Sequence, residues 1–188
     1  PMGDSYHLPG IVLEASSSKT WDVAVSEWHV VGCHDNGNAS GDCLCGHEGI
    51  RYEFTIRNSV NGNELSPIGS TCILKFENDE LKNEVEGWKA AIKLLEALEA
   101  RRPDVRLDGM NRDLFSRRLY AFLYEKGAFP PNRYNGYDGR NDYEFMVNMF
   151  NKRTAPTEKQ RAKMYMVLNK SIFPWLALFG RELREMRL

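Results

Sequence analysis

The sequence lacks a long hydrophobic run. No stretch approaches the ~18–20 consecutive apolar residues that a membrane-spanning helix needs, so we expect no membrane partner. The N-terminal residues also lack the basic and apolar start of a secretory signal, which predicts a cytoplasmic protein. With 42% apolar and 27% charged residues among 188, the composition excludes a collagen-like or wholly disordered chain.

The signatures of several enzyme classes are also missing. His47-Glu48 begins like the metalloprotease motif H-E-x-x-H, but position 51 is Arg. The sequence has no P-C-x-x-C deaminase signature, no glycine-rich phosphate loop and no G-x-S-x-G nucleophile turn. We therefore expect a protein that is not an enzyme, and a metal-dependent nuclease assembled from distant residues is our third hypothesis.

A net charge of −1 hides an asymmetry between the two parts of the chain. Residues 1–75 carry 4 basic and 9 acidic groups, a net of −5, and residues 76–188 carry the other 21 basic and 17 acidic groups, a net of +4. Such a division suggests an anionic partner for the basic part.

The first part of the chain shows the periodicity of strands. Trp21, Val23 and Val25 alternate with polar or small residues, and the pattern extends through Trp28, Val30 and Val31, which predicts a first strand. The polar stretch 34–42 predicts a loop, and the alternation over 50–57 predicts a second strand with one buried face. A return strand is expected over 64–68, after the turn at Asn61-Gly62.

From residue 78 onward the hydrophobic period becomes helical. Apolar residues at steps of three and four predict a helix over 78–101, which Pro103 ends. A second helix is expected over 111–126, with Gly127 as its C-terminal cap. Further helices are expected over 142–152, from residue 154 or 155 to 172, and over 175–187 after Pro174.

The sequence has four cysteines, Cys33, Cys43, Cys45 and Cys72, all in its β-rich part. They could form two disulfides or one metal site, and a cytoplasmic protein favours the metal. Residues 43 and 45 share one face if the backbone is extended, Gly46 permits a turn, and the third thiol follows a run of small residues. A thiolate-rich site favours structural Zn²⁺.

The fourth ligand has more than one candidate. Cys33 would give a Cys₄ site, and His47, which continues the alternation of Cys43 and Cys45, would give Cys₃His. His34 and His29 are weaker candidates. Buried free thiols and disulfides or redox thiols are the alternatives to zinc.

Residues 43–76 resemble a known family. Cys43–His47, Ile50–Asn58 with Asn61-Gly62, and Pro67–Ile73 are similar to a C-x-C-G knuckle, a strand ending in I-x-N with a glycine turn, and a G-S-x-C-I knuckle. This pattern resembles a small zinc-module family of bacteriophage and prophage proteins. The resemblance implies zinc binding, a mobile-element origin and a bacterial host cell.

The basic part contains candidate contact residues for a polyanion. Charged helix faces are commonly only solvated, but cations with nearby tyrosines are also typical of surfaces that bind phosphates and stack bases. The candidates are Arg117, Arg118, Arg133, Tyr134, Tyr137, Arg140, Lys152, Arg153, Lys159, Arg161 and Lys163.

We therefore predict an α+β protein with a zinc-bound antiparallel β-hairpin region followed by a four- to five-helix bundle. Residues 1–20 would be an N-terminal extension, 21–76 a zinc-binding β module and 77–188 a helical domain. The first hypothesis is a non-enzymatic protein that binds DNA or RNA. The alternative is an inhibitor of a host nucleoprotein complex, such as an anti-CRISPR protein.

Overall fold

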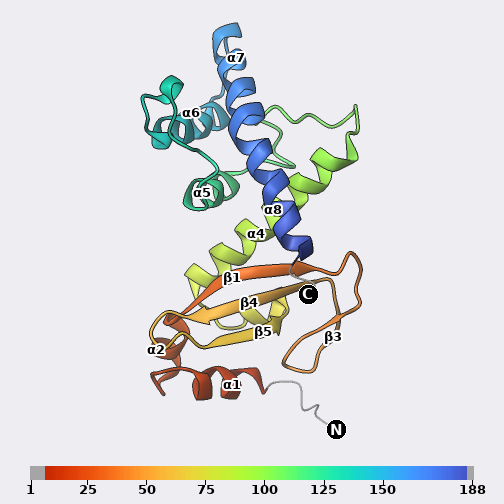
Figure 1. The fold of residues 1–188 in the computed structure, drawn as a ribbon, viewed down its shortest axis with the longest axis vertical. Helices are drawn as coiled ribbons and strands as arrows, with labels where there is room; N and C mark the ends of the chain where they lie inside the picture. The colour runs from red at the N-terminus through yellow and green to blue at the C-terminus, as the bar shows by residue number, and fades with distance from the viewer. Residues whose placement is uncertain (1–6, 186–188) are drawn as a thin grey trace. The chain divides into compact units, whose positions relative to one another are not determined.

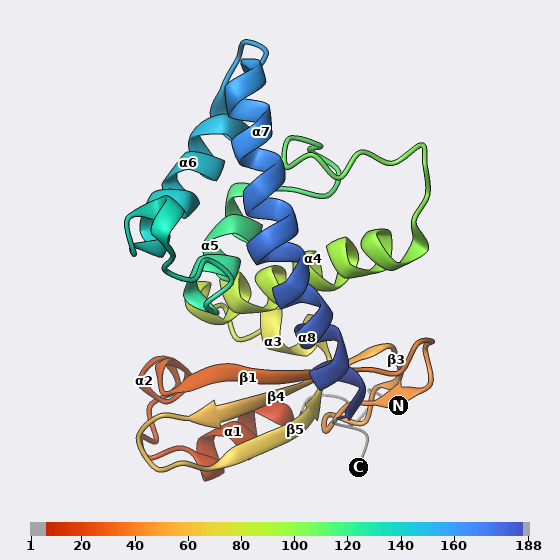
Figure 2. The ribbon, with the colours of Figure 1, turned by 45° about the horizontal axis from the view of Figure 1, so that its top comes forward.

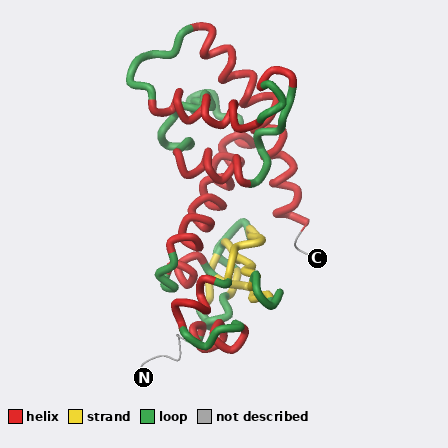
Figure 3. Tube along the Cα trace, turned by 90° about the vertical axis from the view of Figure 1, so that its left-hand side faces the viewer, coloured by secondary structure: helices red, strands yellow, loops and turns green. Residues whose placement is uncertain are grey.

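The computed structural model describes residues 7–185, and it confirms the α+β fold, with a small antiparallel sheet followed by helices (Figure 1). The chain forms two compact units: unit 1 contains the residues up to Val85 and the end from Leu183, and unit 2 contains Glu86–Glu182. Figure 3 shows the strands gathered in unit 1, whereas unit 2 consists of helices and loops. No helix within residues 7–185 is both long and apolar enough to cross a membrane.

Among the described residues, unit 1 combines five strands with short helices. The elements of this unit are α1 (Leu8–Ala15), α2 (Trp21–Ser26), β1 (Trp28–Asp35), β2 (Gly41–Asp42), β3 (Glu48–Ile50), β4 (Tyr52–Asn58), β5 (Glu64–Ile68), α3 (Ser70–Leu74) and the start of α4 (Asp79–Ala100). The predicted return strand matches β5 at both ends. The residues expected to be an extension contain α1, which lies beside β5 in both ribbon views (Figures 1 and 2).

The main sheet of unit 1 has the antiparallel order β1-β4-β5, and β2 pairs with β3 in a separate two-stranded sheet. Cys33 lies opposite Phe54, and Phe54 lies opposite Ile68, so these three residues share one face of the sheet. All three are fully buried. The predicted buried face of the second strand is thus confirmed at Phe54 and Ile56, although the strand begins at Tyr52 and not at Ile50.

The first predicted strand is wrong over Trp21–Ser26, which forms helix α2, whereas its extension through Trp28, Val30 and Val31 lies in β1. Ala24 and Val25 are neighbours in sequence and both are buried, whereas Val23 is exposed, which a strand with alternating faces would not produce. A segment of only six residues with alternating apolar side chains is compatible with a strand or a helix, and tertiary packing decides between them. Here Trp21 packs edge-on against Phe76, with ring centroids 5.6 Å apart.

Glu27, directly after α2, is a buried carboxylate that organises the N-terminal part of unit 1. Its two oxygens accept hydrogen bonds from the backbone N–H groups of Ser17 and Ser18, both at 2.8 Å, and from the amide of Asn58 at 2.6 Å. The Asn58 amide, helped by the two N–H groups, holds the pKa of Glu27 below its usual value although burial opposes this.

We expect Glu27→Gln to lower the urea midpoint at pH 7, because its amide would direct N–H groups at partners that are themselves donors. A lowered pKa gives stability that is present above the unfolded-state pKa of ~4.3 and is lost as the pH falls through the folded-state value. The difference from the unsubstituted protein should therefore shrink between pH 6 and pH 3 in urea titrations.

The matched control is Glu64→Gln, which removes an exposed ion pair with Arg57 and should change the midpoint little. A Glu27→Gln difference that stays constant from pH 6 to pH 3 would contradict the proposed role of the charge.

Unit 2 continues α4 and adds the remaining helices. The elements are α5 (Arg117–Glu125), the short helix η1 (Arg133–Asn135), α6 (Gly139–Asn151), α7 (Glu158–Val167), the π-helix η2 (Leu168–Ile172) and α8 (Phe173–Glu185). The predicted helix over 78–101 agrees with α4. Its core includes Trp88, Phe122 and Phe179, whose rings lie 5.2 to 6.3 Å apart.

Two predicted helix starts are corrected by N-terminal caps. The second helix begins at Arg117 rather than near residue 111, because the Ser116 hydroxyl accepts a hydrogen bond from the Leu119 N–H. The fourth begins at Glu158 rather than near residue 155, because Thr157 and Gln160 form a reciprocal capping box. Gly127 takes the expected left-handed conformation after α5, with φ +87°.

The predicted break at Pro174 is wrong, because α7, η2 and α8 follow one another without interruption. Proline lacks the N–H that an α-helix interior requires. One turn earlier the chain is already wound as a π-helix, in which the Phe173 N–H bonds to the Leu168 carbonyl five residues back. The looser turn accommodates the proline within the helix.

Candidate functional site

Three of the four cysteines converge in unit 1. The Sγ atoms of Cys43, Cys45 and Cys72 all lie within 4.8 Å of one another, all three side chains are buried, and none forms a disulfide. The Sγ atoms of Cys45 and Cys72 are 3.2 Å apart. Within residues 7–185 no other group of three histidine, cysteine or acidic side chains is close enough to hold a metal ion. This cluster could hold one.

A tight turn presents the first two thiols. The Cys43 N–H donates to the His47 carbonyl and the Gly46 N–H donates to the Cys43 carbonyl, both at 2.9 Å. Gly46 has φ +89°, a conformation that a residue with a Cβ rarely adopts. The sequence correctly singled out this glycine, but the sulfurs of Cys43 and Cys45 meet through a turn and not through an extended strand.

The third thiol comes from a helix rather than from a second knuckle. Gly69 precedes α3, and the Cys72 N–H donates to its carbonyl at 3.1 Å in the first turn. Two hydrogen bonds join the segments: the Leu44 N–H donates to the Pro67 carbonyl at 2.8 Å, and the Gly69 N–H donates to Cys43 Sγ at 3.3 Å. Backbone pairing therefore sets the distance between the two cysteine-bearing segments.

The electrostatics of the cluster favour negative charge on one sulfur. Burial alone would raise the pKa of Cys45, but the His47 N–H and the neighbouring thiols outweigh it, so that the pKa is lowered. Burial, together with the hydrogen bond to Cys45, raises the pKa of Cys72 to about 12. The backbone thus directs two N–H groups at sulfur, one at Cys43 and one at Cys45, as is typical of the surroundings of metal-bound thiolates.

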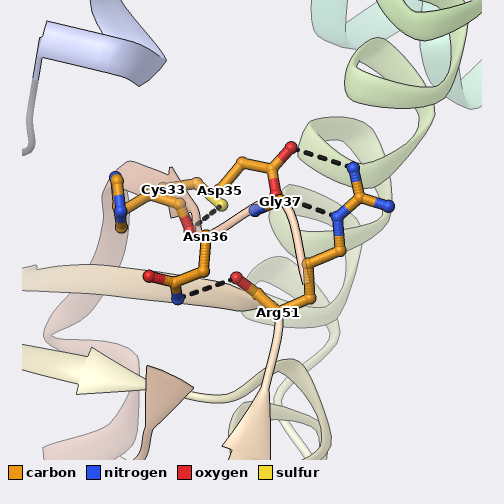
Figure 4. Close-up of polar contacts among 6 residues, drawn as sticks. Cys33, Asp35, Asn36, Gly37 and Arg51 are labelled. Atoms are coloured by element: carbon orange, nitrogen blue, oxygen red, sulfur yellow. Dashed lines mark hydrogen bonds and ion pairs between the residues drawn. The ribbon is translucent and has the colours of Figure 1, made fainter. Parts of the chain in front are cut away.

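The loop that carries Cys43 and Cys45 is fixed at its base (Figure 4). Arg51 donates from Nε and Nη2 to the two carboxylate oxygens of Asp35, at 2.9 and 3.1 Å. Asn36 donates from its backbone and its side chain to the Arg51 carbonyl, both at 3.0 Å. Burial acts to raise the pKa of Asp35, but Arg51 outweighs it and the pKa is lowered. No local sequence signal marks this pair, because its members are 16 residues apart.

Cys33, the predicted fourth ligand, is not part of the cluster. It lies two strands away from Ile68 across the sheet, which corresponds to about 10 Å. Its thiol is buried on the core face and contacts the neighbouring backbone carbonyl of His34. Burial, with Asp35 and Glu53 nearby, raises the pKa of this thiol, which keeps it neutral. The correction follows from sheet register, which sequence spacing does not reveal.

His47, the other candidate ligand, lines the same small cavity of about 150 Å³ as Cys43 and Cys72. Its side chain is exposed. The two weaker candidates lie on β1, where Nδ1 of His29 is 3.2 Å from a carboxylate oxygen of Glu84 and His34 is half-buried.

The predicted contact residues do not form one surface. Arg133, Tyr134, Tyr137 and Arg140 surround the start of α6, and Lys152 and Arg153 follow its end. Thirteen helical residues separate the two groups by about 20 Å. At the first group the charges have local partners: the Arg133 guanidinium lies 4.7 Å from the Tyr134 ring centroid, and Arg140 pairs with Glu144 at 2.9 Å.

At the end of α6, cations from separate segments gather. Arg117 Nε donates to the Asn151 side chain at 2.7 Å, and Arg112 donates to the Phe150 carbonyl at 3.2 Å. Lys152 and Arg153 follow directly, and we call these four cations the basic cluster. None of them contacts a carboxylate anywhere in the described chain. The sequence places Arg112 near Arg117 and Arg118, but its proximity to the end of α6 is a tertiary contact.

The other predicted cations lie elsewhere on unit 2. Lys163 sits 4.4 Å from the ring centroid of Phe145, and Arg161 lines a cavity beside α7. Arg118 and Lys159 are exposed in the first turns of α5 and α7.

The fold and site therefore define an α+β protein with a buried three-cysteine cluster that could hold a metal ion. Comparison with family models, with curated proteins and with solved structures finds no match. The resemblance over residues 43–76 to phage zinc modules thus has no support beyond the motif residues themselves.

Proposed function

We propose that this chain is a non-enzymatic, zinc-containing nucleic-acid-binding protein. Zinc would stabilise unit 1, and the basic cluster on unit 2 would contact phosphates. The observation that supports the binding function most directly is the gathering of Arg112, Arg117, Lys152 and Arg153 without carboxylate partners.

The donor set favours zinc over other ions. Three buried sulfurs are soft ligands, and structural zinc sites are tetrahedral with cysteine and histidine ligands. His47 is the proposed fourth ligand, because it borders the cavity that Cys43 and Cys72 also line. A bound ion would join the turn at 43–46 to α3, and thereby tie two segments that are 27 residues apart.

The surroundings of the basic cluster support a role in binding phosphates. Residues 145–157 contain no acidic side chain, so nothing in that stretch neutralises Lys152 and Arg153. Part of the positive charge compensates the C-terminal end of α6, where Arg112 binds a terminal carbonyl. The other three cations exceed what one helix end requires, and their charge is available to an anionic ligand.

We expect the protein to bind labelled DNA or RNA with an affinity that falls steeply with salt. If all four cations contact phosphates, the slope of log K against log salt is about −3.6 on duplex DNA and about −2.8 on single strands. The affinity then falls about fiftyfold or more between 50 and 200 mM salt. Arg117→Gln combined with Lys152→Gln should reduce the magnitude of the slope by about half. Fluorescence anisotropy titrations at several salt concentrations measure both quantities.

The matched control is Lys89→Gln combined with Lys93→Gln, which removes two exposed cations of α4 from the same unit. This variant should retain the slope of the unsubstituted protein. Absence of binding to both DNA and RNA, or an affinity insensitive to salt, would refute the proposal and favour a direct contact with a host protein complex.

A further inference from the structure

Unit 2 also contains a cavity of about 830 Å³ beside α7, to which the proposed function assigns no role. One wall is the segment 106–110, and the other combines residues 155–156 with the exposed side of α7. Met164 and Leu168 are buried at its apolar base. Cavities that bind organic ligands are commonly of 300–1,000 Å³ and mostly apolar, with a few polar groups.

The wall formed by 106–110 is held by hydrogen bonds. The buried Tyr120 hydroxyl donates to the Gly109 carbonyl at 2.7 Å. Gly109 has φ +84°, and a Cβ there would lie only 2.9 Å from the Tyr120 oxygen. Asp108 accepts from the N–H groups of Met110 and Asn111, at 2.9 and 3.1 Å, and so holds the turn. These contacts fix the backbone of this wall.

The opening of the cavity combines an aromatic ring with positive charge. Tyr165 lines it and yet is 70% exposed. Arg161, also lining it, makes no ion pair among residues 7–185, whereas Arg106 lies 3.6 Å from Asp108. A flat ring attached to an anion would match this combination of aromatic, apolar and cationic groups.

Both walls of the cavity run directly into the basic cluster. Arg112 comes two residues after Met110, and Arg153 comes two residues before Ala155, so each pair of Cα atoms is separated by at most about 7.6 Å. A chain of phosphates on the cluster would thus carry its bases past the opening. This continuity indicates one ligand for both features.

We infer that the cavity takes an unpaired base of single-stranded nucleic acid, which stacks on Tyr165 while its phosphates contact Arg161 and the basic cluster. The inference rests on the proposed function and gives it a substrate class, single strands. A base within a duplex is stacked and paired, and cannot enter. Tyr165 then replaces Tyr134 and Tyr137, the stacking candidates suggested by the sequence.

The test is anisotropy of the full chain with a labelled single-stranded 12-mer DNA and with a copy whose central bases are replaced by abasic sites. Both carry the same phosphates, so only the base contribution differs. We expect the abasic strand to bind about tenfold more weakly or worse, since stacking of one base contributes about that much. Tyr165→Ala should abolish the difference, and Tyr165→Phe should retain it.

Two further variants separate the cavity from general effects on folding. Ala155→Trp adds a ring at the cavity from an exposed position and should also abolish the difference between the strands. Tyr137→Ala removes a tyrosine of similar exposure, 74%, at the other end of α6. This variant should leave the difference in affinity between the two strands unchanged. Circular dichroism confirms that each variant is folded.

Equal, salt-sensitive binding of the two strands would overturn the base-binding cavity while the proposed function survives. The base-binding cavity would also be overturned if Tyr137→Ala, but not Tyr165→Ala, abolished the difference in affinity between the two strands. Binding of neither strand would refute both proposals.

Discussion

Replacing Cys72 by serine is expected to leave unit 1 without bound zinc. The purified unsubstituted protein should contain one zinc ion per chain by elemental analysis, and Cys72→Ser should contain close to none. Because the binding energy of a structural ion is part of the folding energy, unit 1 should lose about 3 kcal/mol or more of stability. Hydrogen exchange of the β4 amides reports on this unit specifically and should become faster by at least about a hundredfold.

The matched control is Cys33→Ala. Cys33 is a buried neutral thiol outside the cluster, so this variant should keep its zinc and lose only the stability of one small core side chain, about 1–2 kcal/mol. His47→Ala should bind zinc more weakly without losing it altogether. Zinc retained in Cys72→Ser but lost in Cys33→Ala would overturn the assignment of the ligands, and absence of zinc from the unsubstituted protein would overturn the site.

Gly139→Ala is expected to be the most damaging single-methyl addition in unit 2. A Cβ at this first residue of α6 would lie 1.8 Å from the backbone carbonyl oxygen of Phe129. Backbone atoms cannot move aside as a side chain can, so either α6 or the segment before it must shift. We expect a loss of about 3 kcal/mol or more, which lowers the melting temperature of a unit of about 100 residues by at least about 12 °C. Calorimetry or thermal circular dichroism measures the change.

Gly136→Ala provides the comparison from the same loop. A Cβ at Gly136 would meet no atom within 4 Å, but the residue has φ +67°. Only the conformational cost of the left-handed region applies, about 1 kcal/mol. Equal losses of stability in the two variants would show that the close approach of the Phe129 carbonyl to Gly139 does not cause the destabilisation.

The two proposed roles divide between the two units. The cysteine cluster, with the loop fixed by Asp35 and Arg51, serves the stability of unit 1. The basic cluster and the cavity both belong to unit 2. Removal of zinc should therefore change stability before it changes nucleic-acid contacts, and the variants at Cys72 and Tyr165 probe separate properties.

The residues that the sequence placed correctly are those with strong local signals. The long amphipathic stripe predicted α4, and the alternation around Phe54 predicted β4. The turn at Asn61-Gly62 predicted the return strand β5. The cysteine spacing and Gly46 identified three of the four predicted ligands as neighbours in space. In each case the structure is determined by contacts between residues close in the sequence, or by a hydrophobic period that places apolar residues on one face of an element.

The errors arise where contacts with residues far away in the sequence determine the local structure. Trp21–Ser26 is helical because packing overrides an ambiguous period, and Cys33 is excluded because sheet register places it on the core face. Pro174 is accommodated by a π-helix that no residue pattern announces.

The amino-acid sequence by itself determined the α+β class, the long helix α4 and a thiol-rich cluster in the first part of the chain, because periodicity and short-range spacing encode them. Only the tertiary structure decided which sulfurs meet, that the predicted basic residues do not form one surface, and that a cavity adjoins one end of α6. Those features depend on register and on helix packing between segments far apart in the chain, which no local pattern records.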